Sequence, residues 1–105
     1  DIASYKEFYF TKEIPVKTQT EVGTLSITSG VWLLIGFMDW NTDQNCVYSF
    51  ILNGRNVRSN ATNGGGTINA SIAKISTTTT FPVGAYHAGS TVMTARSRIY
   101  AIQLG

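Results

Sequence analysis

The amino-acid sequence predicts an all-β fold, an antiparallel sandwich of two sheets with about eight strands. Three observations predict it. Thr and Ser make up 23 of the 105 residues, and Leu, Glu and Lys, which favour helices, are few. Turn residues recur along the chain and separate short stretches in which polar and apolar residues alternate. The length suits one domain with a single core.

The alternation places the strands in order. Pro15 makes residues 14–19 a linker-like approach rather than a central strand, and Pro82 predicts a sheet edge or a bulge. Asn53-Gly54 predicts a tight hairpin, because both residues tolerate the positive φ of a type I′ turn. Strands are expected at residues 5–10, 22–28, 31–40, 46–52, 55–58, 67–75, 81–87 and 91–104. This number of strands with short connections matches a jelly roll.

The strand from Val31 to Trp40 is apolar on both faces. One face carries Val31, Leu33, Ile35 and Phe37, and the other carries Trp32, Leu34, Met38 and Trp40. An antiparallel sandwich buries only one face of each strand. We therefore expect another subunit to cover the second face.

The order of strands also predicts where the loops lie, because alternate loops of an up-and-down succession share one end. The two termini are expected at one end, together with the turns at 29–30, 53–54 and 76–79. The loops at 41–45, 59–66 and 88–90 are expected at the opposite, distal end.

Charge is low and unevenly distributed. All six acidic residues lie within residues 1–43, whereas residues 44–105 hold five Lys and Arg and no carboxylate. Five scattered cations make a poor nucleic-acid footprint, so we expect these charges to pair within the fold or between subunits. The longest apolar run, 31–38, is far shorter than the roughly 20 residues of a membrane span, and no membrane insertion is expected.

The chain has one cysteine, Cys46, and one histidine, His87. These numbers exclude an intrachain disulfide and a metal site built from several Cys and His, and no cofactor is expected. Because the chain begins at Asp1 without Met, it is expected to be part of a longer polypeptide or a processed product.

Three segments resemble a known family: EVGTLSITSGVWLLIGFMDW, SFILNGRNV and VGAYHAGSTVMTARSRIYAIQLG. They resemble the opening strands, the NG hairpin and the closing hairpin of the head domains at the tips of tailed-bacteriophage fibres and receptor-binding proteins. Those heads are similar to the trimeric jelly rolls of complement-type and tumour-necrosis-factor-type proteins. The resemblance covers residues 20–105 and leaves 1–19 as an N-terminal strand or neck region.

The resemblance implies a homotrimer whose N-terminus is joined to a fibre shaft or baseplate of the virion. It also implies binding of a bacterial cell-surface saccharide, by loops at the apex or by grooves between subunits.

A saccharide site pairs an aromatic ring with amide and carboxylate groups. Trp40 is followed by such groups in the loop at 41–45, and two further candidates lie beside the turn at 88–90. The predicted ligand-binding residues are Trp40, Asn41, Asp43, Asn45, Tyr86 and His87. The alternative is that Trp40 only ends a core strand and that His87 is a structural residue. Four arginines either bind acidic saccharide or pair with carboxylates of a neighbouring subunit: Arg55, Arg58, Arg96 and Arg98.

Catalysis is not expected. A Ser-His-Asp set would have to use His87, and no nucleophile-elbow or metal-hydrolase spacing is present. A carboxylate pair for glycoside cleavage could come only from Asp39, Asp43 and the N-terminal acids. The resemblance implies a host-recognition head, and the residues give no support for an enzyme. A purely structural trimerisation cap of a fibre, or a glycan-binding module of a secreted bacterial protein, are the alternatives.

Overall fold

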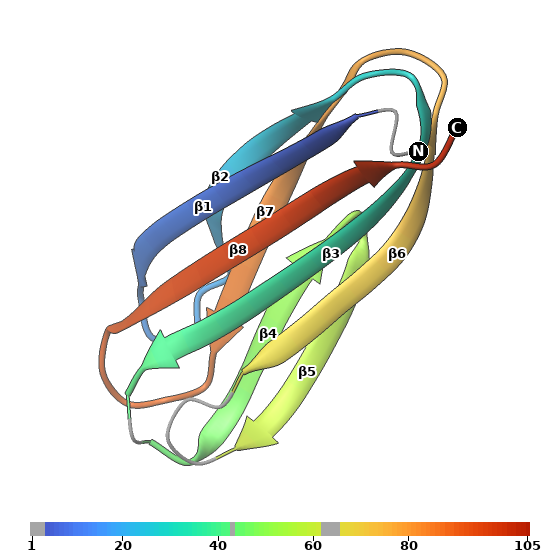
Figure 1. The fold of residues 1–105 in the computed structure, drawn as a ribbon. Helices are drawn as coiled ribbons and strands as arrows, with labels where there is room; N and C mark the ends of the chain where they lie inside the picture. Colours follow the sequence, from blue (N-terminus) through green and yellow to red (C-terminus); the bar gives the residue numbers. More distant parts are fainter. Residues whose placement is uncertain (1–3, 43, 62–65) are drawn as a thin grey trace.

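A computed structural model describes residues 4–42, 44–61 and 66–105 as an elongated body of 43 × 21 × 18 Å (Figure 1). Eight strands form it, and no helix is present among these residues: β1 (Tyr5–Ile14), β2 (Thr20–Ile27), β3 (Gly30–Asn41), β4 (Cys46–Leu52), β5 (Arg55–Ala61), β6 (Thr67–Ile75), β7 (Thr79–His87) and β8 (Met93–Gln103). In this part of the chain there is thus no long apolar helix that could cross a bilayer.

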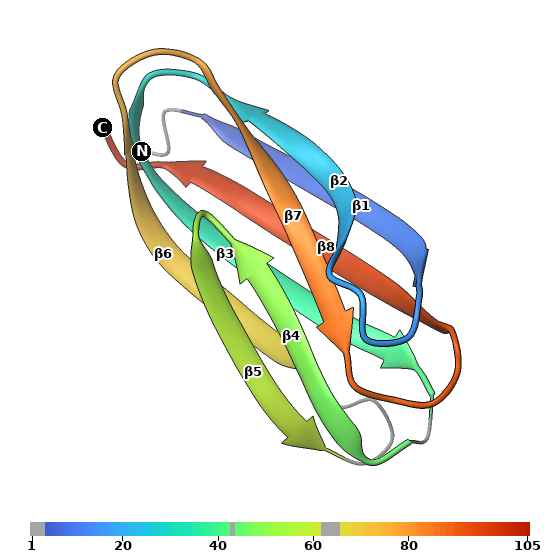
Figure 2. The same cartoon turned by 180° about the vertical axis from the view of Figure 1, so that it is seen from behind.

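The strands make two antiparallel four-stranded sheets, in the orders β1-β8-β3-β6 and β2-β7-β4-β5. The sheets pack face to face as a jelly-roll-like sandwich, and Figure 2 shows the second sheet in front. The start of β1 and the end of β8 lie at one end of the sandwich, with the β2–β3 turn and the β6–β7 connection (Figure 1). The strands β3, β5 and β7 end at the opposite side, as strand parity predicts.

Two strands exceed the lengths that the sequence predicts by three residues or more, because their neighbours pair with them further. β1 continues to Ile14, since every one of its 10 residues pairs with β8, from Tyr5↔Ile102 to Ile14↔Met93. Residues 5–14 of the predicted strand or neck region are thus an edge strand of the sandwich. β5 continues past Arg58 because its pairing with β4 extends to Cys46↔Ala61.

β7 contains Pro82 although it lies between two other strands. The pairing of β7 with β4 ends at Leu52↔Val83, and Pro82 is opposite Thr24 of β2. At Pro82 the strand β7 therefore pairs with β2 alone. On the side of β4 no strand is present to accept a hydrogen bond, so the missing N–H of proline costs no bond there.

The core lies between the sheets and is filled by large side chains of both. Gly36, in the middle of β3, makes room for the Phe50 ring: a Cβ at this position would lie 2.5 Å from Phe50 Cζ. The largest apolar side chains that are completely buried are Trp32, Tyr48, Phe50, Ile14, Leu25, Ile27, Leu34, Met38, Leu52, Ile99 and Val83.

The polarity of β6 is inverted relative to an ordinary sandwich strand. Thr67 and Asn69 face the core, whereas Ile68 and Ile72 face outward with 58% and 53% of their surfaces exposed. The Asn69 Nδ2 group donates to the carbonyl oxygens of Phe50 (3.1 Å) and Arg55 (2.7 Å), which belong to the other sheet. The buried amide of Asn69 therefore links β6 in one sheet to β4 and β5 in the other. The isoleucines of β6 are left on the outer surface.

Candidate functional site

Two of the predicted distal loops are joined by one side chain, Gln44. Its Oε1 atom accepts a hydrogen bond from the backbone N–H of Ser90 (2.9 Å), and its Nε2 group donates to Thr91 Oγ1 (2.7 Å). The hydroxyl of Tyr48 donates to the carbonyl oxygen of Gln44. The loops at 41–45 and 88–90 are thus adjacent, whereas residues 62–65 of the third predicted loop lie outside the described residues.

Trp40, the aromatic platform expected from the sequence, lies in the core. Only 3% of its surface is exposed, because its ring packs against Tyr48 (centroids 5.2 Å apart) and against the edge-on ring of His87 (5.6 Å). A buried indole has no face to offer a sugar ring. Of its predicted partners, Asn41 and Asn45 are exposed, and Asp43 lies outside the described residues.

His87 is also buried, and both of its ring nitrogens are used. The backbone N–H of Gly89 donates to Nδ1 (3.1 Å), so the ring proton is on Nε2, which donates to the carbonyl oxygen of Ile14 (2.8 Å). His87 therefore links the end of β7 to the end of β1. This burial favours the structural alternative for His87 over a direct contact with a sugar.

Among the described residues, five of the eight exposed large hydrophobic side chains lie on the outer side of the sheet β1-β8-β3-β6, which we call the aromatic face. The register aligns its residues in rows across the four strands. These rows are Tyr5, Ile102, Leu33 and Ile72; Glu7, Tyr100, Ile35 and Ala70; and Tyr9, Arg98, Phe37 and Ile68. The second face of β3, which the sequence marks as apolar, is the centre of this surface.

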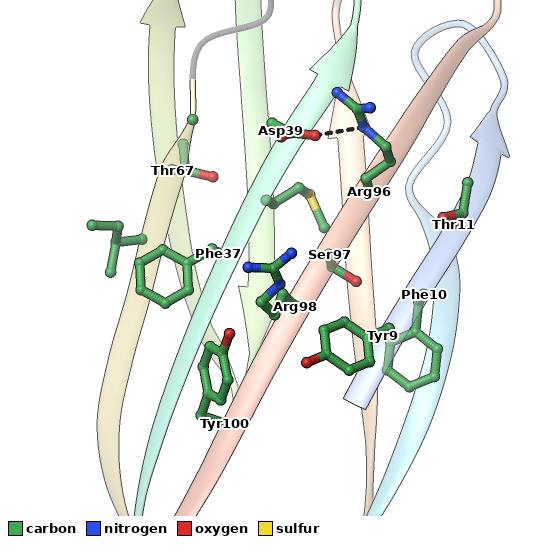
Figure 3. Close-up of a pocket in the computed structure, with 13 residues that line it drawn as sticks. Tyr9, Phe10, Thr11, Phe37, Asp39, Thr67, Arg96, Ser97, Arg98 and Tyr100 are labelled. Atoms are coloured by element: carbon green, nitrogen blue, oxygen red, sulfur yellow. Dashed lines mark hydrogen bonds and ion pairs between the residues drawn. The ribbon is translucent and has the colours of Figure 1, made fainter. Parts of the chain in front are cut away.

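A groove of about 860 Å³ crosses the aromatic face (Figure 3). Arg98 lies with its guanidinium carbon 5.4 Å from the ring centroid of Tyr9, and Tyr100 meets Phe37 edge to face at 6.1 Å. Nearer the distal end, Arg96 Nε donates to Asp39 Oδ1 at 2.8 Å, which is the ion pair drawn in Figure 3. The groove is thus lined by aromatic rings and guanidinium groups, and both kinds of group can bind a partner.

Two tyrosines of the aromatic face hold their protons more strongly than usual. Partial desolvation and the hydrogen bond from Tyr5 Oη to Glu7 Oε1 (2.9 Å) raise the pKa of Tyr5 to about 12, although half of the ring is exposed. Desolvation and the proximity of Glu7 also raise the pKa of Tyr9. The neutral, protonated tyrosine is therefore the form that this surface favours.

No group of three or more metal-binding side chains is present in the part of the chain that the structure describes.

The remaining predicted residue, Tyr86, is half-buried on the outer face of the other sheet. It borders a hollow that also contains Ser49 and Arg58, which the sequence did not mark as a group with Tyr86. The pairing of Ser49 with Arg58 could have been predicted from the sequence. A tight turn at Asn53-Gly54 pairs Leu52 with Arg55, and the same register then pairs Ser49 with Arg58. The pairing of Ser49 with Tyr86 depends on the order of strands in the sheet.

Comparison with known proteins identifies no relative by sequence, since neither a protein family nor a curated protein matches the chain. Among solved structures, the chain is similar to a de novo designed double-stranded β-helix determined by solution NMR, with a TM-score of 0.42 and 13% identity. The match covers 90% of this chain and 97% of the designed one. At this TM-score the likeness carries no weight for function.

Proposed function

We propose that this chain is a host-recognition head at the tip of a bacteriophage tail fibre or of a baseplate protein. It acts in the virion, outside the host cell, as a homotrimer that binds a bacterial surface saccharide. It is a binding protein and not an enzyme, and it works without a cofactor. The main support for this proposal is the exposure of the aromatic face.

An exposed apolar surface that continues across four strands is typical of an interaction site. A further copy of the chain suits it, because acids and bases lie within and beside its apolar rows. Glu7 and Asp39 supply the acids, and Arg96, Arg98 and Lys74 supply the bases. Around a three-fold axis, one half of such a face meets the other half of the neighbouring copy, so a face that carries both signs of charge can pair acids with bases.

The position of the chain ends supports attachment to a shaft. The start of β1 and the end of β8 share one end of the sandwich (Figure 1). Three copies that pack with their long axes together would send every N-terminus toward the same side. The opposite end, with the exposed amides of Asn41 and Asn45, would then point away from the shaft. Amides both donate and accept hydrogen bonds, as binding to sugar hydroxyls requires.

A structural trimerisation cap, without a ligand, is the second candidate. It is favoured by the burial of Trp40 and His87, which removes the two strongest sugar-binding candidates at the distal end. The cap requires the same aromatic face and the same trimer.

The mass of the protein in solution tests the assembly. Light scattering after gel filtration at micromolar concentration should give three times the chain mass of 11.4 kDa. Ile72→Lys places a charge in the aromatic face and should give a monomer with an unchanged circular dichroism spectrum. Thr24→Lys, the matched change on the exposed side of β2, should leave the trimer intact. A monomeric wild type would contradict the proposal and favour a glycan-binding module.

Binding of the wild-type trimer to an array of bacterial glycans separates the head from the cap. The head should bind a subset of the array, and the signal should survive washing because three sites act together. A trimer that binds no glycan on the array would leave the cap as the function.

A further inference from the structure

A hollow of about 400 Å³ lies on the outer face of the sheet β2-β7-β4-β5, the sheet in front in Figure 2. Tyr86 of β7 and Arg58 of β5 stand on its two sides, and Ser49 of β4 lies between them. The register requires this order, since Ser49 pairs with Arg58 on one side and with Tyr86 on the other. Only 3% of Ser49 is exposed, so this small residue forms the floor between two large ones.

The polar groups around the hollow have no partners in the described part of the protein. Among the described residues, no hydrogen bond or ion pair engages the Arg58 guanidinium, the Tyr86 hydroxyl or the side-chain amides of Gln19 and Asn56. The described residues that line it include one cation and no carboxylate. An unpaired guanidinium beside neutral donors is suited to a carboxylate or phosphate, to which arginine can donate two parallel hydrogen bonds.

We propose that this hollow binds a saccharide that carries an acidic group. The acidic group accepts hydrogen bonds from Arg58, and the apolar face of the sugar ring lies against Tyr86. The amides of Asn56 and Gln19 bond to the ring hydroxyls. The volume falls within the roughly 300–1,000 Å³ of small-ligand sites. The inference rests on the proposed function, and it moves the binding site from the distal loops to the side of the head.

The location is compatible with the proposed trimer. The hollow lies on one sheet and the aromatic face on the other, so covering the aromatic face leaves the hollow in solvent. A trimer would carry one hollow per subunit, all on its outside. Weak individual sites would then act together on a repetitive polysaccharide.

The test is an array of bacterial saccharides in three groups: neutral, uronic-acid-bearing and phosphate-bearing. The wild-type protein should bind members of an acidic group and no neutral glycan. Arg58→Gln and Tyr86→Ala should each weaken that binding about tenfold or more. Raising the salt concentration should weaken the wild type and affect Arg58→Gln less. Which acidic group binds tells whether the acid is a carboxylate or a phosphate.

Arg55→Gln is the matched control, since it removes the same charge from the same strand outside the hollow and should bind like the wild type. Unchanged thermal melting and solution mass would show that the two hollow variants are folded and assembled. Binding that persists in both variants, or that is restricted to neutral glycans, would overturn the acidic-saccharide site while leaving the proposed function in place. No binding of the wild type to any glycan would overturn both.

Discussion

His87 shows how one polar side chain joins two strands at the boundary of the core. Its ring accepts from the Gly89 N–H and donates to the Ile14 carbonyl oxygen, and neither backbone group is left without a partner. His87→Leu introduces an apolar side chain of similar size and removes both bonds. We expect the free energy of unfolding to fall by about 2–4 kcal/mol, because two buried backbone groups lose their partners. Chemical denaturation followed by tryptophan fluorescence measures this.

The same variant decides between the structural and ligand-binding roles of His87. A structural residue lowers stability while the folded protein keeps its affinity for glycans. Loss of glycan binding in His87→Leu at unchanged stability would contradict the structural role and would mean that His87 contacts the ligand.

The sequence predicts the environment of single residues only in part. Trp40 falls on the same side of its strand as Trp32 and Leu34, and all three are indeed buried. Alternation alone, however, cannot decide which side of β3 faces the core when both sides are apolar. Packing against the other sheet determines it, because Tyr48 of that sheet contacts Trp40.

At the scale of elements, β6 is held to the opposite sheet by a polar group. Asn69 donates from one sheet to the Phe50 and Arg55 carbonyl oxygens on both sides of the β4–β5 hairpin turn. Asn69→Leu should lower the free energy of unfolding by about 1–3 kcal/mol, since a buried donor to two acceptors is lost. Hydrogen exchange should accelerate in β4 and β5 more than in β1 and β8. Asn60→Leu, an exposed change on the same hairpin, should leave both measurements unchanged.

A uniform acceleration of exchange in Asn69→Leu would mean that the amide stabilises the whole sandwich and does not hold the hairpin in particular.

β6 also shows where prediction of elements stops. Its boundaries, Thr67 to Ile75, follow from alternation and agree with the structure, as do those of β4. Its orientation does not follow, because the apolar side, with Ile68 and Ile72, is the exposed one. Hydrophobic patterning assumes that the apolar side meets the core of its own chain. The inversion is expected where a strand contributes to a surface between chains.

At the scale of the whole molecule, the uneven charge distribution has a structural counterpart. β1 and β3 bring carboxylates to the aromatic face, and β8 brings arginines between them. The Asp39–Arg96 pair at 2.8 Å is the one ion pair among the described residues, and both side chains are more than half exposed. Such an exposed pair adds little stability. In the proposed trimer these charges would lie between subunits, on the surface that the apolar rows also form.

The pH dependence of stability tests the state of this face. The pKa of Tyr5 is raised from 10.0 to about 12 in the folded protein, so the folded chain keeps a proton that the unfolded chain loses between these values. The resulting stabilisation is complete below pH 10 and is lost as the pH rises through 12. We expect the free energy of unfolding to fall less steeply over this range in Tyr5→Phe than in the wild type, with urea midpoints at pH 9.5 and 11.5 as the measurement.

In the proposed trimer the effect extends to assembly, because an ionised tyrosine would be buried between subunits. The wild type should dissociate at a lower pH than Tyr5→Phe, and identical profiles for mass and stability would place Tyr5 outside the interface.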